Sequence, residues 1–130
     1  MWYCVGVVSV NKEGSMRKAM VLIAAMLLFF SPVYAHPPSD ILIKFDPQTK
    51  ILQAEIIHQV SNPASHFIAK VDVGLNNKEI ISQVISRQDN NVSQTVSFLI
   101  PDASVGDILS VEGYCSLSGK LEKQIKVSGK

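Results

Sequence analysis

Most of the motifs that mark an enzyme are missing from this sequence. It has no CxxC or HExxH pattern, no glycine-rich phosphate loop, no nucleophile elbow and no paired carboxylates at catalytic spacing. These absences speak against hydrolase and kinase chemistry. Internal repeats, low-complexity tracts and long charge runs are missing as well, so nothing divides the main part of the chain into several domains.

An excess of positive charge is also missing from the part of the chain that follows Ala35. Residues 36–130 carry nine Lys and Arg against ten Asp and Glu, which gives a net charge of −1. Nucleic-acid-binding domains gather Lys and Arg into a basic face, and this composition provides none. We therefore expect no nucleic-acid partner.

A secretory signal is present near the start of the chain. A basic pair at 17–18 is followed by an apolar run at 19–30, a Ser-Pro breaker and small residues that lead to Ala35. We predict a bacterial signal peptide at 16–35, cleaved after Ala35. The protein is then exported to the periplasm.

Two further expectations follow from this signal. Its apolar run is shorter than the roughly 20 residues of a membrane-spanning helix, so membrane contact is expected only if the signal is retained as an anchor. Residues 1–15 do not resemble part of a signal, and we interpret them as a non-native extension ahead of a start at Met16. The mature domain is then 36–130, and its cysteine content falls to one because Cys4 is removed.

Short stretches rich in Ile and Val recur through the mature domain, separated by turn residues. Their spacing of about 8 to 12 residues is typical of a sandwich or barrel, and none shows a sustained helical period. The predicted strands are 41–45, 51–60, 67–75, 79–86, 92–100, 107–115 and 120–127. Strands with one apolar face bury it against a second sheet, so we predict an all-β antiparallel sandwich of about seven strands, preceded by a signal helix.

The residues that carry chemistry in the mature domain are three histidines and one cysteine: His36, His58, His66 and Cys115. Singly, each has an ordinary structural interpretation, and a free cysteine often behaves as a small buried hydrophobe. Their arrangement favours a site. His58 closes one predicted strand and His66 opens the next, while Cys115 ends another, and loops at one end of a sandwich cluster in space.

A metal ion suits this set of side chains. Imidazole binds iron, copper and zinc, and thiolate adds a strongly donating ligand. Coordination would also explain why an exported protein keeps one unpaired thiol, because a bound metal deprotonates the thiol and gives it a defined role.

Two segments, HQVSNPASHFIAKVDVGLNNKEI at 58–80 and GYCSLSGKL at 113–121, resemble motifs of the superoxide reductase family, also called the desulfoferrodoxin iron-binding domain. The shared order is an early His before Pro, a His pair, and Cys near the end, and it extends over essentially the whole mature domain. The resemblance implies a seven-stranded immunoglobulin-like sandwich. It also implies a ferrous iron with four equatorial imidazoles and an axial thiolate, and an activity that reduces superoxide to peroxide.

Carried over to this chain, the resemblance implies an axial thiolate and three imidazole ligands: Cys115, His58, His66 and His36. Ser118 stands where the family has its fourth histidine, and Ala35 stands where the family has a lysine. Three imidazoles and a thiolate still suffice for a metal. The missing lysine removes a charge that would attract an anionic substrate, so these departures weaken the implied reductase activity more than metal binding.

We therefore expect an exported mononuclear metal-binding domain with a redox or oxidative-stress role. Iron is the expected cofactor, with copper or zinc as alternatives, and the partner is a small molecule such as superoxide or a redox partner protein. Whether the domain is an oxidoreductase enzyme or only binds metal stays open at this point.

Three alternatives remain beside this expectation. The sandwich could have lost its metal and serve as an interaction module through an exposed strand edge. Cleavage after Ala35 would leave the α-amine and imidazole of His36 free to chelate copper. Cys115 could form a disulfide between two molecules.

Overall fold

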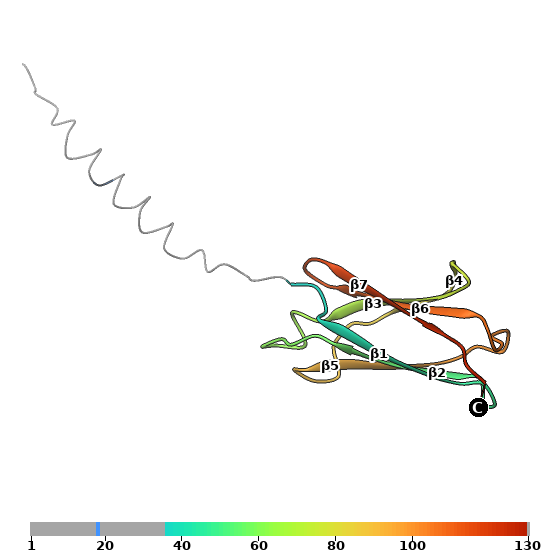
Figure 1. Cartoon of the computed structure of the whole chain (residues 1–130). Coiled ribbons are helices and arrows are strands. Elements are labelled where there is room, and N and C mark those ends of the chain that lie inside the picture. Colours follow the sequence, from blue (N-terminus) through green and yellow to red (C-terminus); the bar gives the residue numbers. More distant parts are fainter. Residues whose placement is uncertain (1–17, 19–35, 130) are drawn as a thin grey trace, which may run out of the picture. The chain divides into compact units, whose positions relative to one another are not determined.

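The computed structural model describes Lys18 and residues 36–129 (Figure 1). The predicted extension at 1–15 and almost all of the predicted signal peptide at 16–35 lie outside the described residues. Within the described part of the chain, no helix is long and apolar enough to span a membrane.

Seven antiparallel strands form the domain, as predicted. They are β1 (Asp40–Asp46), β2 (Ile51–Ile57), β3 (Ile68–Leu75), β4 (Lys78–Val84), β5 (Ser93–Leu99), β6 (Ile108–Cys115) and β7 (Lys120–Lys126). One sheet has the order β1-β2-β5 and the other the order β4-β3-β6-β7, and every pairing is antiparallel. Figure 1 shows the two sheets facing each other as the layers of a sandwich.

The core lies between the sheets because apolar residues alternate along each strand. In β2, Leu52, Ala54 and Ile56 are buried while their neighbours are more exposed, as the period of two requires. Each fully buried Ile or Leu contributes about 1.5–3 kcal/mol to folding. The sheets approach closely at Gly113 of β6, where an added Cβ would lie 3.1 Å from Cγ2 of Ile56.

Tight turns fix the strand register. β3 and β4 are joined by Asn76 and Asn77, which have φ angles of 51° and 67°. Two consecutive residues with positive φ are typical of the type I′ turn that connects twisted antiparallel strands. The Asn76 side chain also donates a hydrogen bond to Asp107 and accepts one from the Ile108 N–H, which ties this hairpin to the start of β6.

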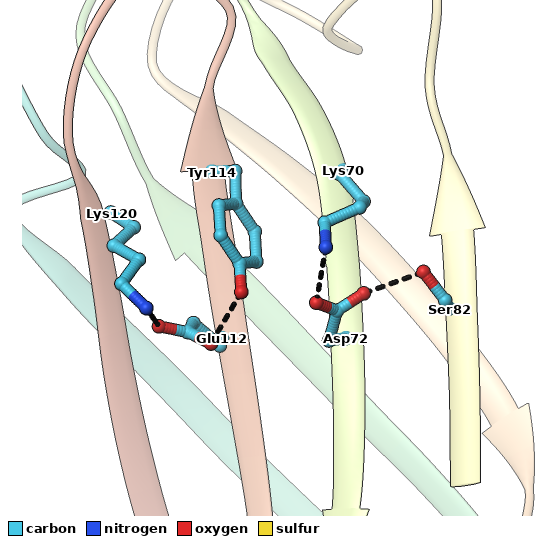
Figure 2. A network of polar contacts seen from close by, with 6 residues as sticks. All are labelled: Lys70, Asp72, Ser82, Glu112, Tyr114 and Lys120. Carbon is cyan, nitrogen blue, oxygen red and sulfur yellow. Dashed lines mark hydrogen bonds and ion pairs between the residues drawn. The ribbon is translucent and has the colours of Figure 1, made fainter. Parts of the chain in front are cut away.

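The outer face of the four-stranded sheet carries a polar network (Figure 2). Its six members come from all four strands: Lys70, Asp72, Ser82, Glu112, Tyr114 and Lys120. Asp72 is only 6% exposed and accepts hydrogen bonds from the Lys70 ammonium at 2.6 Å and the Ser82 hydroxyl at 2.6 Å. The charge of Lys70 is therefore engaged within this network, where its Nζ also lies 4.0 Å from the centre of the Tyr114 ring.

Candidate metal centre

The chain segment at 36–39 is held along the end of β2. The Ser39 N–H donates to the Ile57 carbonyl at 2.8 Å, and Pro38 is buried. Pro37 packs against Gly119, where an added Cβ would lie 2.9 Å from Cβ of Pro37 and 3.1 Å from its backbone nitrogen. These contacts place His36 beside the first residue after β2.

That first residue is His58. Its N–H donates to the Val92 carbonyl at 2.8 Å, which continues the pairing of β2 with β5 beyond the end of the strands. The ring is fully buried. Its Nδ1 lies 2.9 Å from Oε1 of Gln88, and its Nε2 lies 3.2 Å from the carbonyl oxygen of His36.

His66 is positioned by the turn that connects β2 with β3. Asn62 organises this turn, because its side-chain oxygen accepts from the Ala64 N–H and its carbonyl accepts from the His66 N–H at 3.0 Å. Directly after His66, Phe67 donates its N–H to the Ser116 hydroxyl and accepts the Ser116 N–H at 2.8 Å. This exchange brings the turn against the end of β6.

Cys115 is the last residue of β6 and is paired with Ile68 of β3. Its Sγ lies 3.1 Å from Nε2 of His66 and accepts a hydrogen bond from the Leu117 N–H at 3.4 Å. The thiol is partly exposed and forms no disulfide within the described residues. It therefore faces the histidine cluster and is not buried among aliphatic side chains.

Three imidazoles meet at this end of the sandwich. One ligand atom from each of His36, His58 and His66 lies within 4.8 Å of the other two, and the ring centres are 4.7 to 5.2 Å apart. Nitrogens that share one ion are at most about 4.2 Å apart, because each metal–nitrogen bond is about 2.0–2.1 Å long. A shared ion would therefore draw these nitrogens closer together than the 4.8 Å limit that describes them here.

The cluster opens toward solvent on one side. His58 is buried, His66 is half-buried and His36 is exposed. Burial lowers the pKa of His66 below its ordinary value, and the neighbouring rings of His58 and His36 lower it further. This shift favours the neutral imidazole, which is the form that binds metal.

The structure brings the four predicted ligands together, though not equally. Cys115 contacts His66 but is outside the group of atoms that all lie within 4.8 Å of one another, so Sγ must move toward the other two rings to share one ion with them. Ser118, which the resemblance to superoxide reductases places at their fourth histidine, is exposed. The ligand roles themselves stay a prediction.

Gln88 was not among the residues expected from the sequence. It lies in the loop between β4 and β5, is 1% exposed and contacts the His58 ring. A glutamine among polar turn residues carries no local signal of such a role. Only the fold shows that this loop returns to the end of β2.

Comparisons with protein families, with curated proteins and with solved structures find no match.

Proposed function

We propose that this domain binds one transition-metal ion through His36, His58 and His66, with Cys115 as the fourth ligand. The observation that carries the proposal is the convergence of three imidazoles, from three separate segments of the chain, to within 4.8 Å. Protonation of the rings opposes this arrangement because it places like charges together, whereas a bound cation stabilises it. The thiol at 3.1 Å from one of the rings adds a softer donor.

The metal that we propose first is iron, in an exported domain with a redox or oxidative-stress role related to superoxide reductase. The order of histidines and cysteine along the chain supports this relation, as do the seven strands in sheets β1-β2-β5 and β4-β3-β6-β7, which fit an immunoglobulin-like sandwich. A ferrous ion bound here would supply a single electron to a small oxidant such as superoxide. The residues of the chain would hold the ion in place and admit a small anion on the open side, at His36.

Copper is the second candidate, because the donor set suits it as well. Imidazoles combined with one cysteine thiolate are the ligands of copper electron-transfer sites, whose potential depends on hydrogen bonding to the sulfur. Here the Leu117 N–H supplies such a bond to Sγ of Cys115. No carboxylate belongs to the three-histidine group in the described residues.

The test is anaerobic titration of the purified protein with Fe²⁺, Cu⁺ or Cu²⁺, and Zn²⁺, followed by absorption and metal analysis. We expect one equivalent of metal bound with micromolar or tighter affinity, and a thiolate charge-transfer band with iron or Cu²⁺. The variant Cys115→Ala should lose the band, because Cys115 is the only cysteine in residues 36–130. Failure to bind any of these metals would remove the proposal.

A further inference from the structure

Gln88 makes hydrogen bonds in four directions from a buried position. Its Nε2 lies 2.8 Å from the carbonyl oxygen of His58 and 2.8 Å from that of Asn90. Its Oε1 lies 3.3 Å from the Ile68 N–H and 2.9 Å from Nδ1 of His58. All of its polar atoms are therefore engaged.

These partners fix which end of the amide donates. Carbonyl oxygens only accept and a backbone N–H only donates, so Gln88 must direct its NH₂ group toward His58 and Asn90 carbonyls and its oxygen toward Ile68. The same oxygen faces the His58 ring and has no hydrogen to give. Nδ1 of His58 must then carry the proton of this hydrogen bond.

A neutral imidazole has one N–H, so Nε2 of His58 is left with a bare lone pair. Nε2 lies 3.2 Å from the carbonyl oxygen of His36, which also only accepts. The same reasoning applies to the His36 ring. Its Nδ1 lies 3.1 Å from the Pro37 carbonyl oxygen, which only accepts hydrogen bonds, so Nδ1 carries the proton and Nε2 keeps its lone pair. The lone pair on Nε2 of His58 and the carbonyl oxygen of His36 thus face each other with no hydrogen between them, and a nearby cation would stabilise this arrangement.

We propose that Gln88 is a positioning residue of the metal centre: it holds His58 in the Nδ1–H tautomer and so presents Nε2 as the metal ligand. Metal-binding histidines commonly donate their second N–H to such an outer partner, which fixes tautomer and ring orientation. In the opposite tautomer, an Nε2–H would donate to the His36 carbonyl at 3.2 Å and place a proton where the metal binds. The binding part of this inference rests on the proposed function, whereas the tautomer is a property of the metal-free protein.

Three variants separate positioning from support of the fold. Gln88→Met keeps the volume but removes acceptor and donors together. Gln88→Glu keeps an acceptor oxygen for the His58 ring and removes the NH₂ group that binds the two carbonyls. Gln94→Met is the matched control, because Gln94 is also a buried glutamine with bonds to Asp89 and to the Thr95 carbonyl but has no imidazole partner.

The first readout is the tautomer of His58 in the metal-free protein, measured by long-range ¹H–¹⁵N NMR of ¹⁵N-histidine-labelled samples at pH 8. Three ring signals are expected and are assigned by single histidine substitutions. We expect the Nδ1–H form in the unmodified protein, in Gln88→Glu and in Gln94→Met, and a shift to the Nε2–H form in Gln88→Met. The Nε2–H form in the unmodified protein, or no shift in Gln88→Met, would overturn the inference.

The second readout is Zn²⁺ affinity. Loss of an outer hydrogen-bond partner typically weakens metal binding about 10–100-fold, so Gln88→Met should lose that factor while Gln88→Glu and Gln94→Met bind as the unmodified protein does. Equal losses in all three variants would reduce Gln88 to a support of the fold. If no variant binds metal but the tautomer shifts as expected, the proposed function fails and the positioning of His58 by Gln88 stands.

Discussion

Replacing Gly119 by alanine tests whether the contact of Pro37 with Gly119 positions His36, one of the proposed metal ligands. Gly119 has a φ of +87°, and an added Cβ would lie 2.9 Å from Cβ and 3.1 Å from the backbone nitrogen of Pro37. Side chains rarely adopt this backbone conformation, and the strain costs about 1–3 kcal/mol. Because part of the clash is with backbone, the segment that carries His36 must shift as well.

Gly106 offers the matched control. Its φ is +97°, but nothing lies within 4 Å of an added Cβ. Gly106→Ala should therefore show the backbone strain alone, and Gly119→Ala should lose at least as much stability in urea unfolding of the metal-free protein, because the clash with Pro37 adds to the same strain. Only Gly119→Ala should also weaken Zn²⁺ binding, by about 10–100-fold, the range found when the support of a metal ligand is disturbed. Equal metal affinity in the two alanine variants would refute the placement of His36 by the contact of Pro37 with Gly119.

Two further predictions concern the stability of the fold away from this contact. Burial alone would raise the pKa of Asp72, but hydrogen bonds from Lys70 and its neighbours outweigh burial and lower it. The unfolded chain then binds more protons than the folded one as pH falls from about 4 through the folded-state pKa, so the free energy of unfolding should drop there. Urea midpoints measured across this pH range should show the drop, and the drop should be smaller in Lys70→Met. The same dependence of the urea midpoint on pH in Lys70→Met would contradict the role of the Lys70 ion pair. Gly113→Ala places a Cβ 3.1 Å from Ile56 in the packed core and should cost about 1–3 kcal/mol of unfolding free energy, and an unchanged urea midpoint would show that the sheets can separate freely at this point.

The strands were predictable because side-chain alternation and turn residues both act locally. In β1, Ile41 is buried and Leu42 is 48% exposed, as the period of two indicates. The predicted strand 51–60 runs past the end of β2 at Ile57. Backbone hydrogen bonds from His58 and Val60 to the loop before β5 continue there, so the sequence pattern followed the pairing beyond the regular strand.

The site was predictable only in part. His58, His66 and Cys115 lie at strand ends, and the ends of neighbouring strands meet in a sandwich, so their residue types and positions were enough to expect them together. The contact of Gln88 with His58 spans 30 residues and joins a loop to a strand end across the fold. No local pattern encodes such a contact, nor the packing of Pro37 on Gly119.

X-ray absorption spectroscopy of the Zn²⁺-loaded protein measures the centre most directly. One ion bound by His36, His58, His66 and Cys115 predicts three nitrogens at about 2.0–2.1 Å and one sulfur at about 2.3 Å. The sulfur shell should vanish in Cys115→Ala. A shell of oxygen and nitrogen without sulfur, unchanged when the three histidines are replaced by alanine, would show that zinc binds elsewhere and that these four side chains form no metal centre.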